Sequence, residues 1–346
     1  MRLNHIYNKE TEMITEPLKT LLANGPILFD GAMGTMLQNA GLTDGGAPEL
    51  WNVEKPEVLK KIHQEYIDAG ARIIETNTFG GTMARLKFHN IGDRVAELNR
   101  AGASIAKEVA APAGALVAGS IGPTGELIEP VGPLSMEEAT AMFAEQAAAL
   151  AEGGADIFLI ETMSHLNEVE AAVHGAQKVA PHVPIFVSMS FDTNYHTMMG
   201  VSPSEAATLL TEMGVSVVGS NCGTGPDEAD LIMGEMARAR PDGAALMVYC
   251  NAGLPQYVNG AIEYDGTPER MAKYAISMRN MGVDIIGGCC GSEPKHIKAM
   301  ADALASVKDT PIPGPPAVET LAENVESADS RAARSAERRN ARRKRA

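Results

Sequence analysis

The stretch IFLIETMSHLNEVEAAVHGAQKVAPHVPIFVSMS, residues 157–190, places a segment of helical periodicity between two short apolar runs. The runs, Ile157–Glu161 and Ile185–Ser190, begin with consecutive apolar residues rather than alternating apolar and polar ones, a pattern typical of parallel strands buried on both faces. The segment Asn167–Val179 between them has apolar residues at helical spacing. These residues therefore predict a strand–helix–strand repeat of a parallel α/β fold.

The same alternation continues on both sides of this stretch, and proline or glycine lies at many of the predicted helix ends. The other predicted strands are Ile27–Asp30, Arg72–Glu75, Leu116–Ser120, Ser216–Ser220, Ala245–Cys250 and Val283–Gly287. The other predicted helices are Pro56–Ala69, Arg94–Ala111, Ser135–Glu152, Ser202–Met213, Pro226–Ala239, Thr267–Met281 and Glu293–Ser306.

Eight strand–helix repeats predict a (β/α)8 TIM barrel. They extend over roughly 280 residues, close to the usual size of that fold. An open doubly wound sheet is the competing architecture. The turn at Asp30–Gly34 lacks the glycine spacing of a dinucleotide-binding motif, which favours the barrel.

The chain outside the repeats predicts two further segments. Residues 1–25 are expected to form a helical lead-in to a barrel over residues 26–308. The proline-rich run at 311–316 indicates an extended linker. The rest of residues 309–346 is rich in Ala, Glu, Ser and Arg with few large apolar side chains, which predicts a basic, disordered tail.

The charge distribution argues against nucleic acid as the main ligand. The net charge is −15, but residues 331–346 carry eight basic residues and one acid. The remaining residues 1–330 have 21 basic against 43 acidic residues, a net charge of −22, and so lack a basic surface. No apolar run is long enough to span a membrane, and residues 1–20 lack a secretory signal. We therefore expect a cytoplasmic protein whose four cysteines are reduced thiols.

Those cysteines all fall at the carboxyl ends of predicted strands, where TIM barrels place their active sites. Cys289 and Cys290 lie between glycines that allow the backbone to turn so that both sulfurs converge. Cys222 is placed to add a third thiolate, and three thiolates with one open position are typical of a reactive zinc site. Cys250 has two interpretations: an inert core residue, which its apolar strand favours, or a fourth ligand. Four sulfur ligands would give a closed structural zinc site in a non-catalytic protein.

Three carboxylates also end apolar runs, where an unpaired charge is costly. Asp30, Glu75 and Glu161 either accept hydrogen bonds from loop amides or hold the ammonium group of an amino-acid substrate. The glycine-flanked amides after Asp30 are suited to the carboxylate of the same substrate.

These motifs resemble those of the zinc-dependent homocysteine S-methyltransferases, a family of (β/α)8 barrels, from about residue 27 to residue 306. Within the family, additional segments are similar to bacterial betaine–homocysteine methyltransferases. The homocysteine module of cobalamin-dependent methionine synthase is also similar to this chain. The family motifs are found at 30–35, 75–81, 122–125, 221–223, 251–255 and 287–291, and the additional segments at 47–52, 191–193, 198–200 and 264–269.

The resemblance implies residue roles and an activity. By the family pattern Cys222, Cys289 and Cys290 bind Zn²⁺ and are catalytic residues through this metal. The homocysteine sulfur binds the zinc and is methylated to give methionine. On this basis Asp30, Gly31 and Glu161 hold the amino-acid end of homocysteine. Glu75, Asn77 and Asn251 at neighbouring strand ends are predicted as further substrate contacts.

The methyl donor implied by the closest resemblance is glycine betaine. The animal betaine enzymes, however, place tyrosines where this chain has Gly80 and Thr162, and aromatic faces attract quaternary ammonium groups. The alternative is a separate corrinoid protein that supplies the methyl group, as part of a split methionine synthase. The expected partners are thus homocysteine together with either a small methyl donor or a corrinoid protein. The sequence does not determine whether the protein forms an oligomer.

Overall fold

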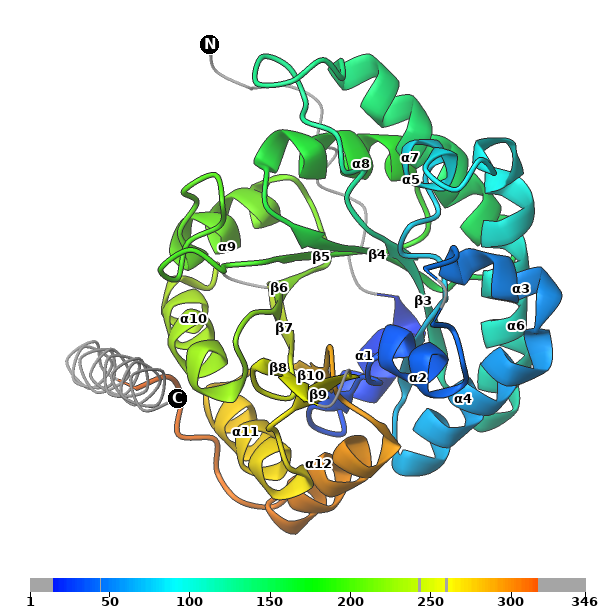
Figure 1. Cartoon of the computed structure of the whole chain (residues 1–346). Helices are drawn as coiled ribbons and strands as arrows, with labels where there is room; N and C mark the ends of the chain where they lie inside the picture. The colour runs from blue at the N-terminus through cyan, green and yellow to red at the C-terminus, as the bar shows by residue number, and fades with distance from the viewer. Residues whose placement is uncertain (1–14, 44, 242–243, 259–260, 317–346) are drawn as a thin grey trace, which may run out of the picture.

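A ring of eight parallel strands forms the centre of the structure (Figure 1). The computed structural model describes residues 15–43, 45–241, 244–258 and 261–316. The strand order is β1-β10-β7-β6-β5-β4-β3-β2, and a bridge between Phe29 and Ile73 brings the first and last strands together. The predicted TIM barrel is therefore confirmed. The barrel strands are β1 Ile27–Leu28, β2 Ile73–Glu75, β3 Leu116–Ile121, β4 Ile157–Met163, β5 Ile185–Met189, β6 Val217–Cys222, β7 Ala245–Cys250 and β10 Ile285–Gly288.

Eight helices surround the ring, each within a few residues of its predicted position. Their ends show ordinary capping chemistry: Ser135 and Glu138 form a capping box, and Gly70 ends the helix before β2 with φ 116°. None of the described helices has the length and apolarity needed to cross a membrane. The surrounding helices are α4 Pro56–Ala69, α6 Val95–Ala113, α7 Met136–Glu152, α8 Leu166–Val179, α9 Pro203–Glu212, α10 Pro226–Ala239, α11 Pro268–Asn280 and α12 Pro294–Ser306.

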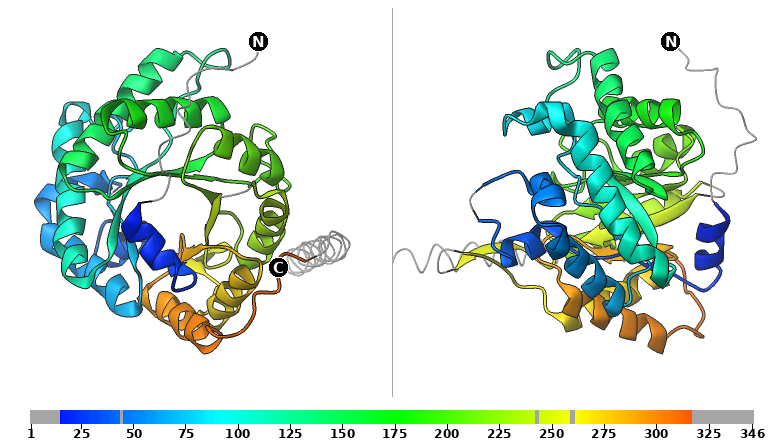
Figure 2. Two further views of the ribbon diagram at one scale, coloured as in Figure 1. Left: turned by 180° about the vertical axis from the view of Figure 1, so that it is seen from behind. Right: turned by 90° about the vertical axis from the view of Figure 1, so that its right-hand side faces the viewer.

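The core has two layers because alternate strand residues face opposite sides of the sheet. On β7, Met247 and Tyr249 belong to the cluster inside the barrel, whereas Val248 and Cys250 belong to the cluster between the sheet and the helices. The helix α1, Glu16–Leu22, lies across the amino-terminal end of the ring, and its Leu18 joins the inner cluster (Figure 2, left). The barrel interior is thus filled and closed at that end.

The long loops contain structure that periodicity did not predict. A hairpin of β8, Pro255–Val258, and β9, Ala261–Tyr264, projects from the side of the barrel opposite α1 (Figure 2, right). The segments after β1 and β2 fold into short helices that are too brief to show a period. These are α2 Met33–Asn39, η1 Pro48–Leu50, α3 Trp51–Glu54, α5 Met83–Lys87 and η2 Gly92–Arg94.

The predicted terminal segments are described only in part. Residues 1–14 of the lead-in and 317–346 of the tail lie outside the described residues. The start of the proline-rich segment is held against α11, because Arg279 donates to the carbonyl oxygens of Thr310 and Pro311. The Gly314 amide also donates to the Asn280 carbonyl, 2.9 Å away.

Candidate functional site

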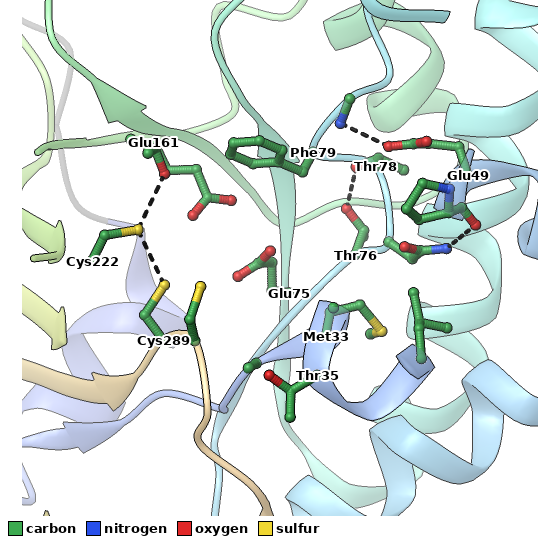
Figure 3. Close-up of a pocket in the computed structure, with 18 of the residues that line it drawn as sticks. Met33, Thr35, Glu49, Glu75, Thr76, Thr78, Phe79, Glu161, Cys222 and Cys289 are labelled. Carbon is green, nitrogen blue, oxygen red and sulfur yellow. Dashed lines mark hydrogen bonds between the residues drawn. The ribbon is translucent and has the colours of Figure 1, made fainter. Parts of the chain in front are cut away.

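A cavity of about 440 Å³ opens at the carboxyl ends of the barrel strands. Its walls come from the loops after β1 and β2 and from the ends of β4, β6 and β10 (Figure 3). Three thiols lie at one side of the cavity, Glu75 lies near its middle and Glu49 lies across from the thiols. The three predicted thiols and the carboxylates of Glu75 and Glu161 therefore line one cavity, whereas Asp30 does not line it and contacts the Glu75 amide.

The three thiols converge on a single point. The Sγ atoms of Cys222, Cys289 and Cys290 all lie within 4.8 Å of one another, and the Cys222–Cys289 pair is 3.4 Å apart. Hydrogen bonds from Cys222 and Cys289 lower the pKa of the Cys290 thiol to about 3. The cluster therefore concentrates negative charge on sulfur, which suits a soft metal cation.

The backbone at the end of β6 determines which cysteines meet. Cys222 and Cys250 are register partners on neighbouring strands, yet Cys250 packs in the outer core and does not join the thiol cluster. Regular alternation would also turn Cys222 outward, since Val218 faces that side. Cys222 instead has φ 63°, an uncommon conformation for a residue other than glycine, and its sulfur faces the cavity.

Hydrogen bonds from the barrel interior hold this turn in place. The Asn221 side chain donates to Thr162 Oγ1 at 2.7 Å and to Cys222 Sγ at 3.3 Å. Its Oδ1 accepts from the Thr162 amide at 2.9 Å and from Ser188 at 2.7 Å. Thr162 also has a positive φ, 58°, next to a register shift in β4. The end of β4 and the end of β6 are thus fixed against each other.

Three carboxyl groups lie near the thiols: Asp30 and Glu161 are buried, and Glu75 is half-buried. Asp30 Oδ2 accepts the Glu75 amide at 2.9 Å, whereas its Oδ1 is buried without a hydrogen-bond partner among the described residues. Glu161 accepts hydrogen bonds from Ser120 and from Tyr249, the latter at 3.1 Å. In the described part of the chain none of the three carboxylates pairs with a basic side chain.

Burial without a cation perturbs all three groups. Desolvation raises the pKa of Asp30 and of Glu75 well above the ordinary carboxyl value, and repulsion from the Glu161 charge adds to both shifts. Desolvation also raises the pKa of Glu161, against the hydrogen bonds from Ser120 and Tyr249. A cation bound among these groups would lower all three pKa values, so the arrangement is complementary to positive charge.

The remaining predicted contacts lie in different places. Gly31 lines the cavity, and a Cβ there would come 2.8 Å from the Tyr66 ring, so glycine is required by close approach. Asn77 also lines the cavity, but its side-chain NH₂ already donates to the Pro48 carbonyl (2.8 Å) and to Asn52 (3.0 Å). Asn251 is not among the lining residues; it donates to the Gly223 carbonyl at 2.6 Å and so holds the loop after Cys222.

Several side chains around the site were not predicted from the sequence. Ser120 ends a predicted strand and Thr162 follows one, so their positions at strand ends are the signal that could have identified them. For Tyr249 the only signal is its inward-facing position on β7. Glu49 is missed because it lies in a long loop, in the segment 47–52. Its carboxylate lines the cavity and accepts the Gly80 amide at 2.7 Å.

Buried amide side chains fix the loop after β2. Asn52 donates to the Asn77 carbonyl (2.8 Å), Gln146 to the Thr78 carbonyl (2.8 Å) and Asn99 to the Gly81 carbonyl (2.8 Å). These donors come from α3, α6 and α7, so three helices hold the cavity wall formed by this loop.

Comparison with known proteins identifies a family. A family model described as homocysteine S-methyltransferase matches residues 27–304. The chain is 33% identical over 320 residues, 88% of its length, to a Mycobacterium tuberculosis protein named methionine synthase, and 33% identical over 86% of its length to the Mycobacterium leprae protein of that name. It spans about a quarter of the length of these relatives, 26% in each case.

Solved structures of one protein are also similar. The homocysteine methyltransferase MmuM from Escherichia coli is 25% identical, with 83% of this chain and 99% of that chain covered. The TM-score is 0.70 for its oxidized form and 0.69 for its metallated form.

Proposed function

The chain belongs to the homocysteine S-methyltransferase family, and we propose that it transfers a methyl group to the sulfur of homocysteine to form methionine. The observation that carries this proposal is the sharing of one cavity by three converging thiols and the carboxylates of Glu75 and Glu161, next to the buried Asp30, with no basic partner for any of the three acids among the described residues. The first group is suited to a metal that binds sulfur, and the second to the ammonium group of an amino acid.

The thiol cluster fits a zinc ion held by Cys222, Cys289 and Cys290. Three sulfurs bound to one tetrahedral zinc, each about 2.3 Å from the ion, lie roughly 3.8 Å apart, and the observed sulfurs need only small movements to reach this spacing. When bound, zinc supplies Lewis acidity that favours the thiolate form of an incoming thiol near neutral pH. Cys250 stays outside the cluster, which supports an open three-cysteine site over the closed structural alternative.

The carboxylates are assigned to the amino-acid end of homocysteine. Asp30 Oδ1 is the buried acceptor that lacks a donor, and an ammonium group provides three. Glu161 and Glu75 both line the cavity, interact with each other and complete the anionic site. With its ammonium group fixed here, homocysteine would extend its thiol towards the three cysteines.

The transfer balances in a single displacement. Homocysteine releases its thiol proton to solvent, and a sulfur electron pair forms the new bond to the methyl carbon. The bond from that carbon to the donor breaks, and its electron pair remains on the donor. Holding both reactants at attack distance can contribute about 7–11 kcal/mol at best. No basic side chain has to accept a proton from the reacting atoms, in keeping with the absence of histidine next to the described thiols.

Glycine betaine is the donor that we favour, and a methylated corrinoid protein is the second candidate. The cavity beyond Glu75 has room for a small donor, which supports the first. The second is favoured by the similarity to proteins named methionine synthase and by exposed apolar side chains on loops after β2 and β5, Phe88, Met198 and Met199.

The proposal is tested with purified protein, homocysteine, zinc and each donor in turn. We expect methionine, and X-ray absorption should show three sulfur ligands becoming four when homocysteine is added. Four sulfur ligands in the resting protein, or no methionine with betaine, a sulfonium donor or methylcobalamin, would overturn it.

A further inference from the structure

The end of the cavity opposite the cysteines carries a second buried acid. We call the side containing Cys222, Cys289 and Cys290 the sulfur end, and the side containing Glu49, Gly80 and Arg85 the donor end. Figure 3 shows Glu49 across the cavity from Cys222 and Cys289. Only 4% of the Glu49 surface is exposed, so this carboxylate is directed into the cavity rather than to the surface.

No described residue neutralises Glu49 at contact distance. Its Oε1 accepts the Gly80 amide at 2.7 Å, but the described chain offers it no ion pair within 4.0 Å. The basic side chains that act electrostatically on Glu49 are Arg85 and His89, which are exposed and line the same cavity. Burial raises the pKa of Glu49, and the Gly80 amide and those basic side chains oppose this shift.

The Arg85 guanidinium is available to bind an anionic group of a ligand. Within the described residues it forms no ion pair, although it lines the cavity. Arg85 and His89 are four residues apart on and just after α5, so they lie at the same edge of the opening. The donor end therefore has an anion inside and a cation at its mouth.

Recognition at this end relies on charge more than on aromatic faces. A Cβ at residue 80 would lie 2.8 Å from Glu49 Oε1, so any side chain there would displace the carboxylate. The carboxylate of Glu49 can therefore occupy this position only because residue 80 is glycine. Phe79 and Phe88 add apolar surface to the cavity, and Glu49 supplies the negative charge that would neutralise a bound cation.

We propose that Glu49 and Arg85 are the residues that determine donor specificity at this end: Glu49 binds the methylated ammonium or sulfonium group of an onium carboxylate, and Arg85 binds its carboxylate. This inference rests on the proposed function, since it assigns the second substrate of that reaction. It places the onium group between Glu49 and the sulfur end, with the carboxylate towards solvent.

The chemistry predicts a specific kinetic signature. When the bond from the onium atom to the methyl carbon breaks, the electron pair stays on nitrogen or sulfur and the positive charge disappears. Glu49 therefore stabilises the bound donor at least as strongly as the transition state. An interaction of this kind affects KM and leaves kcat nearly unchanged.

The test compares Glu49→Gln with Glu54→Gln, an exposed acid five residues away. Gln keeps an acceptor for the Gly80 amide and removes only the charge. We expect Glu49→Gln to raise the KM for glycine betaine and for its sulfonium analogue roughly 10- to 100-fold, with kcat within about threefold. Glu49→Asp, which keeps the charge, should retain more affinity than Glu49→Gln. The Glu54 variant should match the unmodified protein.

Arg85→Gln tests the other half of the site. We expect it to raise the KM for both carboxylate donors roughly 3- to 10-fold and to leave the KM for tetramethylammonium and trimethylsulfonium unchanged, because these lack a carboxylate. Comparing the KM of the ammonium donor with that of the sulfonium donor, among the carboxylate donors and among the donors without a carboxylate, shows which onium group the protein prefers.

Two outcomes would overturn the inference. One is an unchanged donor KM in a folded Glu49→Gln protein; the other is turnover with methylcobalamin but with no onium donor. In the second case methylation of homocysteine would still stand, whereas failure with every donor would reject the proposed function itself.

Discussion

The sulfur end and the donor end of the cavity are built from different parts of the barrel. Cys222 lies at the end of β6 and Cys289 directly after β10, so ladder register and a local backbone turn set their positions. Glu49 and Arg85 come from the loops after β1 and β2, which buried amide side chains from surrounding helices hold in place. One end is thus fixed by the barrel and the other by loop packing.

This difference has a functional consequence. The barrel cannot change strand register without disturbing its whole core, because the inner and outer clusters alternate along every strand. Loops tolerate change more readily. We infer that homocysteine chemistry belongs to the rigid part of the architecture, and that the choice of methyl donor depends on the loops.

Replacing a sulfur ligand should have the largest effect. Cys289→Ala is expected to lower kcat/KM by at least about 1,000-fold and to abolish zinc binding, because it removes one of three sulfurs from the cluster. Metal content by atomic absorption and methionine formation are the measurements.

Cys250→Ala is the matched control for this substitution. Cys250 is buried in the outer core, so we expect the loss of about 1 kcal/mol of stability with activity and zinc content retained. Loss of zinc from the Cys250 variant would instead support a four-cysteine site.

Removing the Glu161 charge should have the next largest effect, confined to one substrate. Glu161→Gln keeps oxygen and nitrogen atoms for Ser120 and Tyr249 but loses the attraction for ammonium. We expect the KM for homocysteine to rise roughly 100-fold with the donor KM unchanged. The exposed Glu137→Gln serves as the control. Equal effects on both substrates would mean that the two ends are not independent.

Acidification should weaken homocysteine binding by up to about tenfold per pH unit for each proton taken up. Ammonium binding requires ionised carboxylates, and burial raises the pKa values of Asp30 and Glu75. Affinity should therefore be retained at high pH and lost as pH falls, beginning above the range in which an ordinary carboxyl group protonates. The KM for homocysteine measured from mildly acidic to mildly alkaline pH checks this, with zinc content determined at each pH. A flat profile would argue against these acids as the ammonium site.

The smallest effect is expected from the amides behind the donor end. Gln146→Leu removes the donor to the Thr78 carbonyl and should cost about 1–3 kcal/mol of stability. Because it loosens the loop after β2, we expect the donor KM to rise a few-fold with the homocysteine KM unchanged. Thermal unfolding and steady-state kinetics test this against Gln64→Leu on the exposed face of α4.

Much of the fold was predictable because parallel strands and covering helices leave a period in the sequence. All eight barrel strands and the eight surrounding helices lie within a few residues of their predicted positions. The hairpin β8–β9 and the helices in the first two loops were not predicted, since elements of three to seven residues are too short to show a period.

The candidate site likewise has features that the sequence determines and features that depend on the tertiary structure. The sequence by itself determined that Cys222, Cys289, Asp30 and Glu161 would gather at one rim, because every parallel strand of a barrel ends on the same side. Only the tertiary structure decided that Cys222 turns inward while its register partner Cys250 faces the helices, since one positive φ reverses the alternation. It also brought Glu49 into the cavity, because the position of a loop side chain depends on packing between segments distant in the sequence.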